Sequence, residues 1–125
     1  RLVTPKTRAI ILSNLHNPSG AVIPRDVMRT IGDIADRVGA MVLVDEVYLD
    51  FVFDVAATAA AAPAAVTLQN AVSWSSTTKA FGFGALRVGW IVTRDRDAAK
   101  AIRDAANYLH VDIPSSSAWA ATQVL

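Results

Sequence analysis

Three short motifs in this chain combine side chains that could hold and activate a small organic ligand. They are His16–Gly20 (His-Asn-Pro-Ser-Gly), Asp45–Tyr48 (Asp-Glu-Val-Tyr) and Ser76–Lys79 (Ser-Thr-Thr-Lys), the last followed by Arg87 eight residues after the lysine. Together they supply an amide, a carboxylate, a phenol, an amine and a guanidinium. A ligand with an aldehyde, a phosphate, a ring nitrogen and a ring hydroxyl would use every one of these groups.

Lys79 is the candidate nucleophile of this set. A lysine held in a desolvated pocket beside other cationic groups loses part of its proton affinity and forms imines with aldehydes. Arg87 offers a planar fork that matches a phosphate dianion, and Ser76 can donate to the same phosphate. The alternative is that both cations are solvated surface charges. The apolar neighbours Leu86 and Val88 argue against that alternative for Arg87.

Asp45 ends an apolar run, where an unpaired carboxylate would be costly. A protonated pyridine nitrogen would pair with it, and the carboxylate would keep that nitrogen charged, so that the ring draws electrons from a substrate. Tyr48 and Asn17 could both bond a ring hydroxyl. Ordinary alternatives exist: a helix cap or magnesium ligand for Asp45, a core tyrosine for Tyr48, and a turn residue for Asn17. His16 is expected to be a turn residue or to lie behind the ligand-binding groups.

The apolar runs 9–13 and 41–44 predict buried strands, with a helix between them that starts near Pro24 and ends at Gly39. This strand–helix–strand order implies a parallel pair with a right-handed crossover. Further strands are predicted at 71–75 and 88–92. Asp95 is expected to cap a helix reaching Leu109, and Ser115–Ser117 to cap a last helix. The alanine-rich stretch 55–65 predicts a surface helix or a mobile loop without chemistry.

The predicted strands bring the three motifs together. In open α/β sheets, ligands bind outside the carboxyl ends of the parallel strands. Asn17, Asp45 and Ser76–Lys79 each follow the carboxyl end of a predicted strand. We therefore expect them to converge on one crevice although they are spread over some sixty residues.

Composition excludes several classes of protein. The 125 residues fit one domain or a piece of one, and a net charge of +1 argues against nucleic acid or a membrane surface as a partner. Without cysteine there is neither a disulfide nor a thiolate metal site, and His16 and His110 are too far apart to predict a metal centre. The chain has no membrane-spanning apolar stretch, no signal region and no initiator methionine. These features predict a cytoplasmic sequence that is a piece of a larger protein.

The motifs resemble those of the class I/II aminotransferases, which are fold-type I enzymes dependent on pyridoxal 5′-phosphate. The family's Asn-Pro-Ser/Thr-Gly corresponds to Asn17–Gly20, its Asp-Glu-x-Tyr to Asp45–Tyr48, and its lysine segment to Ser76 through Arg87 and Gly89. The resemblance implies an α/β three-layer sandwich with a mostly parallel sheet. Residues 1–125 would then be part of the cofactor-binding large domain, without its N-terminal part and without the small domain.

The resemblance also implies catalytic roles for three residues. Lys79 would hold the cofactor as a Schiff base and later move the proton of the substrate Cα, Asp45 would pair with the pyridine nitrogen, and Tyr48 would bond the ring hydroxyl. The implied reaction transfers an amino group from an amino acid to a 2-oxo acid. Family members are usually homodimers that complete their sites with other segments, so the piece alone is expected to be inactive.

The cofactor-binding set implied by the resemblance is larger than this catalytic set. It adds Asn17 at the ring hydroxyl and Ser76 and Arg87 at the phosphate. Glu46 belongs to the second motif but receives no direct role. No metal is implied.

Other readings share parts of the pattern. Related lyases and synthases carry the same motifs, as does a cofactor-binding sensor domain of a transcription regulator, which a basic helix-turn-helix upstream would favour. Ser76–Lys79 also fits the Ser-x-x-Lys of penicillin-binding proteins, but the accompanying Ser-Asp-Asn and Lys-Thr-Gly are absent. A strand ending in Asp45 fits a nucleotide hydrolase, but no phosphate-loop motif occurs. Gly82, Gly84 and Gly89 do not have the spacing of a dinucleotide-binding loop.

Overall fold

A computed structural model describes residues 2–53, 62–110 and 112–125 of the chain. Their strands form one sheet in the order β1 (Ala9–Ser13), β2 (Met41–Asp45), β3 (Ala71–Ser76) and β4 (Gly89–Thr93). The pairs β1–β2 and β2–β3 are parallel, and β4 is antiparallel to β3. The predicted α/β fold with a mostly parallel sheet is therefore confirmed.

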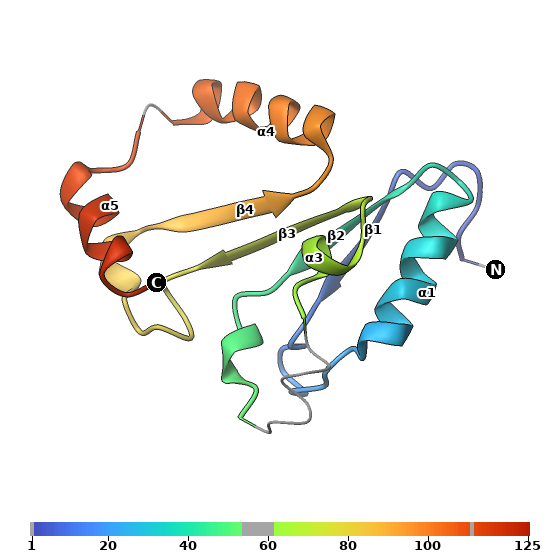
Figure 1. The fold of residues 1–125 in the computed structure, drawn as a ribbon, viewed down its shortest axis with the longest axis horizontal. Helices are drawn as coiled ribbons and strands as arrows, with labels where there is room; N and C mark the ends of the chain where they lie inside the picture. The colour runs from blue at the N-terminus through green and yellow to red at the C-terminus, as the bar shows by residue number, and fades with distance from the viewer. Residues whose placement is uncertain (1, 54–61, 111) are drawn as a thin grey trace.

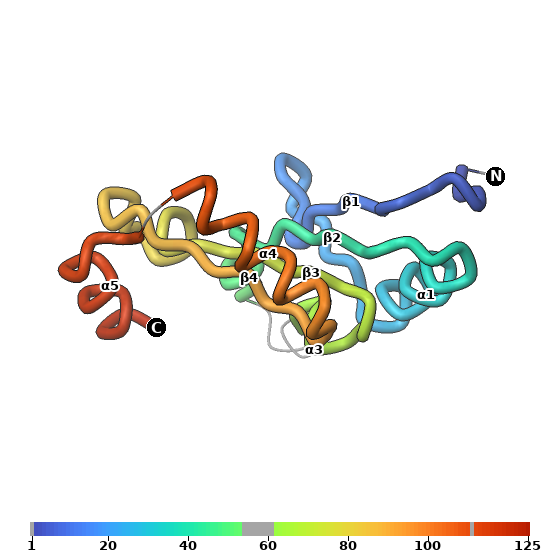
Figure 2. The backbone as a smooth tube through the Cα atoms, turned by 90° about the horizontal axis from the view of Figure 1, so that it is seen from above, coloured from blue at the N-terminus to red at the C-terminus, as the bar shows by residue number. Residues whose placement is uncertain are grey.

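Helices flank this sheet on one face and at its β4 edge. They are α1 (Arg25–Asp36), α3 (Ala64–Thr67), α4 (Arg96–Leu109) and α5 (Ser115–Thr122), with two short 3-10 turns, η1 (Leu49–Phe51) and η2 (Gly84–Leu86). The helix α1 contacts β2 and α3, while α4 contacts β4 and α5 contacts η2. Figures 1 and 2 place α1 and α5 at opposite ends of the molecule, with the strands between them.

The ends of these helices follow from local chemistry. Beyond the end of α1, Gly39 adopts a positive φ of 68°, a conformation that glycine reaches without steric cost. Asp95 caps α4 as predicted, because its carboxylate accepts from the backbone N–H groups of Asp97 and Ala98. The capping expected from Ser115–Ser117 is wrong: α5 begins at Ser115 itself, and its N-cap Pro114 provides no side-chain hydrogen bond.

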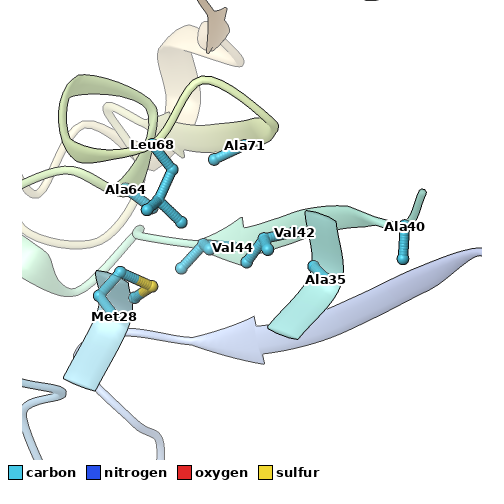
Figure 3. Packing of buried hydrophobic residues seen from close by; sticks show 8 residues of the cluster. All are labelled: Met28, Ala35, Ala40, Val42, Val44, Ala64, Leu68 and Ala71. Carbon is cyan, nitrogen blue, oxygen red and sulfur yellow. The ribbon is translucent and has the colours of Figure 1, made fainter. Parts of the chain in front are cut away.

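The core lies on the face of the sheet that α1 and α3 cover. Figure 3 shows the side chains of Val42 and Val44 between residues of α1 and residues at α3. The whole cluster consists of Met28, Ala35, Ala40, Val42, Val44, Ala64, Leu68 and Ala71. Because side chains alternate along a strand, the burial of Val42 and Val44 sends Asp45 to the opposite face. Among the described residues, Ile11 on that face is 70% exposed.

The alanine-rich stretch only partly lies within the described residues. Residues 54–61 are outside them, so the expected surface helix or mobile loop concerns a segment that the structure does not describe. At the end of the stretch, Ala64 and Ala65 are fully buried in α3 rather than on the surface. Their small side chains let α3 pack closely on β3. In the described part of the chain, no helix has both the length and the apolar character needed to cross a membrane.

Candidate active site

Asp45 lies in an open pocket at the carboxyl ends of the parallel strands. Ser13, Asp45 and Trp74 are paired in register across β1, β2 and β3, so their side chains share one face of the sheet. The pocket measures about 640 Å³, and its lining residues are Ile11, Leu12, Ser13, His16, Ala21, Ile23, Asp45 and Trp74. One carboxylate oxygen of Asp45 accepts from the backbone N–H of Val47 at 3.1 Å. The pocket thus offers a carboxylate, an imidazole and an indole to a ligand.

Lys79 and Tyr48 come together although they belong to different motifs. The Lys79 Nζ lies 6.0 Å from the centroid of the Tyr48 ring, at the edge of cation–π range. Tyr48 follows β2 and Lys79 follows β3, so both are delivered by the carboxyl ends of adjacent parallel strands. The convergence expected of Asn17, Asp45 and Lys79 stays a prediction, since the contact that the structure shows for Lys79 is with Tyr48.

The desolvated pocket expected around Lys79 is not formed by the described residues. Lys79 is exposed in the loop that follows β3, and the ring of Tyr48 approaches its amine from the end of the neighbouring strand. The loop itself is anchored by an edge-to-face contact between Phe81 and Trp90, with ring centroids 6.1 Å apart. The loop is thus packed on β4, while the side chain of Lys79 remains exposed.

Arg87 and Ser76 stand at the two ends of the loop that carries Lys79. Ser76 is the last residue of β3 and pairs with Gly89, and its hydroxyl accepts from the Thr78 N–H at 3.3 Å. The Arg87 side chain is exposed, so its apolar neighbours do not bury it as expected. Its Nη1 donates to the Gly84 carbonyl at 3.4 Å. Ser76 and Arg87 thus flank the base of the loop, and a shared anion between them stays a prediction.

The backbone of Arg87 is left-handed, with φ 56° and ψ 34°. This conformation costs a residue with a Cβ about 1–2 kcal/mol relative to the right-handed region. Of the described residues other than glycine, Arg87 alone has a positive φ. Backbone strain of this kind clusters at binding sites, which agrees with a functional role for Arg87.

The first motif forms a loop at the rim of the Asp45 pocket. Asn17 is exposed in it, and its place at a ring hydroxyl stays a prediction. His16, which received no firm role, lines the pocket, and its Nδ1 lies 2.7 Å from the Ser19 hydroxyl. The described residues contain no cluster of three or more acidic, histidine or cysteine side chains that could hold a metal ion.

Glu46, to which the sequence assigned no role, is a buried anchor behind the site. Its Oε1 accepts from the backbone N–H of Ala64 at 2.7 Å, and the neighbouring Ser73 hydroxyl accepts from Ala65 at 3.0 Å. Burial raises the pKa of the Glu46 carboxyl, and its hydrogen bonds to Ala64 and Ser73 oppose that rise. The carboxylate thereby fixes the point where the chain returns to the sheet after the alanine-rich stretch.

The raised pKa of Glu46 predicts a pH-dependent stability. The folded state binds the proton more tightly than the unfolded state, whose pKa is near the ordinary 4.5. The stabilisation by this proton is therefore complete below pH 4.5 and is lost as pH rises through the folded pKa. Glu46→Gln keeps an oxygen acceptor for Ala64 without a charge, so its unfolding free energy should lack this decline.

Chemical denaturation across pH 4 to 8 measures this difference, with Glu46→Ala as the contrasting variant. The alanine variant leaves the buried Ala64 N–H without its acceptor and should be about 1–3 kcal/mol less stable than Glu46→Gln at every pH. A Gln variant with the same pH profile as the unmodified protein would contradict the assignment of this titration to Glu46.

Comparison with known proteins identifies the family of this chain. The family model described as aminotransferase class I and II matches residues 1–125. A probable N-succinyldiaminopimelate aminotransferase of Mycobacterium tuberculosis is 37% identical over 72% of this chain and 23% of its own length. Aromatic-amino-acid aminotransferase 2 of Thermococcus litoralis is 31% identical over 82% of this chain and 26% of its own length. The chain thus spans about a quarter of the length of these curated relatives.

The fold points to the same family. A PLP-dependent aminotransferase from Streptococcus suis superposes with a TM-score of 0.75 and 28% identity, covering 86% of this chain and 27% of that one. The resemblance to the class I and II aminotransferases, a family that uses pyridoxal phosphate, is therefore confirmed. This chain belongs to the class I and II aminotransferases, pyridoxal-phosphate-dependent enzymes of fold type I.

Proposed function

We propose that this chain supplies the cofactor-binding core of an enzyme that transfers an amino group from an amino acid to a 2-oxo acid. The observation that carries the proposal is the approach of the Lys79 amine to Tyr48, at the carboxyl ends of the strands β2 and β3, the first of which also ends in Asp45. An amine, a phenol and a carboxylate at adjacent strand ends match the aldehyde, ring hydroxyl and ring nitrogen of pyridoxal phosphate. When bound, this cofactor supplies an electron sink that makes the substrate Cα–H acidic.

The candidate site residues have separate tasks in this proposal. The Lys79 Nζ carries the cofactor through a Schiff base and, once released, holds and moves the Cα proton. The Asp45 carboxylate keeps a proton on the ring nitrogen, and Tyr48 and Asn17 donate to the ring oxygen. Ser76, the last residue of β3, and Arg87, two residues before its β4 partner Gly89, bind the phosphate in this proposal.

The exposure of Lys79 indicates what the rest of the enzyme must add. We propose that residues 1–125 are part of a large domain, and that segments outside this chain exclude water from the amine. Only then would the lysine be desolvated enough to form an imine readily at neutral pH. The homodimeric state and the cytoplasmic location expected from the sequence stay predictions.

Arg87→Gly tests the phosphate assignment against the strain at this position. Glycine relieves the left-handed backbone, so the unfolding free energy should hold or rise by about 1 kcal/mol. Binding of pyridoxal 5′-phosphate should nevertheless weaken by at least about tenfold, because a charge-assisted bidentate bond is lost. The affinity for unphosphorylated pyridoxal should hardly change. Equal losses for both ligands would contradict the phosphate role of Arg87.

The proposed reaction is tested in the longer protein that we expect to contain this chain. Purified protein is supplied with pyridoxal phosphate and with amino acids of several side-chain classes, together with pyruvate or 2-oxoglutarate. Formation of the new amino acid from the 2-oxo acid supports transfer. Release of ammonia without transfer would indicate a lyase, and binding without turnover would indicate a sensor domain; either result overturns the proposed reaction.

A further inference from the structure

The first residue after each of the three parallel strands is polar and buried. Asn14 follows β1, Glu46 follows β2 and Thr77 follows β3, and their exposed fractions are 1%, 4% and 0%. Each stands at the root of a loop that carries residues of the proposed cofactor site. We propose that these three are positioning residues, with Thr77 setting the place of Lys79. The inference rests on the proposed function of that site.

Asn14 closes the loop that carries Asn17. Its Oδ1 accepts from the backbone N–H of Ile23 at 2.9 Å, joining the two ends of the loop. Its own N–H donates to the carbonyl of Asp45 at 2.8 Å. The buried side chain thereby joins the ends of the first loop, and the backbone of the same residue ties that loop to Asp45, the proposed partner of the ring nitrogen.

Glu46 ties the turn that carries Tyr48 to neighbouring segments of the chain. Its carboxylate holds Ala64, while its carbonyl accepts from the Ser75 hydroxyl at 3.3 Å and from the Leu49 N–H at 3.0 Å. Ser75 belongs to β3, so the turn after β2 is tied to the neighbouring strand. The position of the Tyr48 ring therefore depends on contacts that Glu46 makes on both sides.

Thr77 closes the Lys79 loop at two points. Its hydroxyl lies 3.2 Å from the Val88 carbonyl and 3.3 Å from the Phe83 carbonyl, and it can donate to one of them at a time. Its backbone N–H donates to Val88 at 3.0 Å, and its carbonyl accepts from the Phe83 N–H at 2.9 Å. The loop segment containing Lys79 is thus bounded by Thr77 and Phe83. Arg87 directly precedes Val88, whose carbonyl is the other point to which Thr77 is bonded.

This arrangement makes Thr77 more than a stabilising residue. Lys79 is two residues from Thr77 and is exposed, so little other than the loop backbone determines where its amine lies. Loss of the hydroxyl removes one anchor from a loop that carries both the covalent and the phosphate contacts of the proposed site. A displacement of about 1 Å at a reacting group can lower a rate about 10²-fold.

The test compares Thr77→Val with Thr77→Ser in the longer protein, because valine keeps the volume and serine keeps the hydroxyl. In cofactor-free protein, amide hydrogen exchange of residues 78–88 should accelerate at least tenfold in the valine variant alone. After loading with pyridoxal phosphate, the pH titration of the visible absorption should shift in that variant, and kcat should fall about 10²-fold. The serine variant should restore all three readouts to near wild type.

Thr30→Val is the matched control, since the Thr30 hydroxyl also donates to a backbone carbonyl, that of Asp26 at 3.0 Å, but on the exposed surface of α1. It should leave exchange of 78–88, the titration and kcat unchanged. Unchanged exchange and titration in Thr77→Val would overturn the inference. So would faster exchange throughout the protein without rescue by serine, which would indicate a role in stability alone. A wild-type protein that takes up no cofactor would refute the proposed function, while the exchange experiment would still decide whether Thr77 anchors the loop.

Discussion

Replacing Lys79 by alanine is expected to reduce amino-group transfer on the order of 10⁴-fold, the upper range for the loss of a positioned acid–base group. The variant loses both the nucleophile that would carry the cofactor and the group that would move the Cα proton. Lys79→Arg should be equally inactive, because a guanidinium keeps the charge but forms no Schiff base. Steady-state assays of the longer protein, with folding checked by thermal unfolding, measure both variants.

Lys100→Ala is the matched control for these variants. Lys100 is also exposed, but it lies on α4, where its Nζ pairs with Asp104 at 2.6 Å. Surface pairs of this kind contribute about 0–1 kcal/mol, so the control should be stable and fully active. A Lys79→Ala variant that retains activity within tenfold of the control would remove Lys79 from its proposed role.

Replacing Asp45 by asparagine is expected to lower amino-group transfer by about 10²–10⁴-fold while the cofactor still binds. Asparagine keeps an oxygen that can accept from Val47, so the local geometry is retained. It no longer provides the negative charge that favours a protonated ring nitrogen, and an opposite charge within about 4–6 Å changes a pKa by about 1–3. The cofactor then withdraws electrons from the substrate less strongly.

Asp36→Asn, at the exposed end of α1, is the control for Asp45→Asn. Equilibrium binding of pyridoxal phosphate separates the two possible causes of a loss in activity. Near-normal turnover in Asp45→Asn would exclude the proposed partner of the ring nitrogen. Loss of binding in proportion to loss of turnover would assign Asp45 to anchoring alone.

The strands and their order of appearance were predictable because the signal is local. Runs such as 9–13 and 41–44 are apolar enough for burial in a parallel sheet, and Gly39 and Asp95 mark helix ends through their own backbone or carboxylate chemistry. The alternation of side chains along β2 explains why Asp45 faces away from the core, since Val42 and Val44 are buried. The meeting of Lys79 with Tyr48 followed from one rule, that parallel strands deliver their carboxyl ends to the same edge.

Features that depend on distant contacts were not predictable in this way. The burial of Glu46 requires the N–H of Ala64, 18 residues away, and that of Thr77 requires the Val88 carbonyl, 11 residues away. A polar residue directly after an apolar strand was the available signal, but it does not identify its partner. The left-handed backbone of Arg87 and the exposure of Lys79 likewise depend on how the loop closes over β4.

The central claim is that the Lys79 amine carries the cofactor, and covalent labelling tests it most directly. The longer protein is loaded with pyridoxal phosphate, reduced with borohydride and digested, and the pyridoxyl-labelled peptide is sequenced by mass spectrometry. Reduction converts a Schiff base into a stable amine, so the label marks the lysine that formed it. We expect stoichiometric label on Lys79. Label on Lys6, Lys100 or any other lysine, or no label in protein that binds the cofactor, would contradict it.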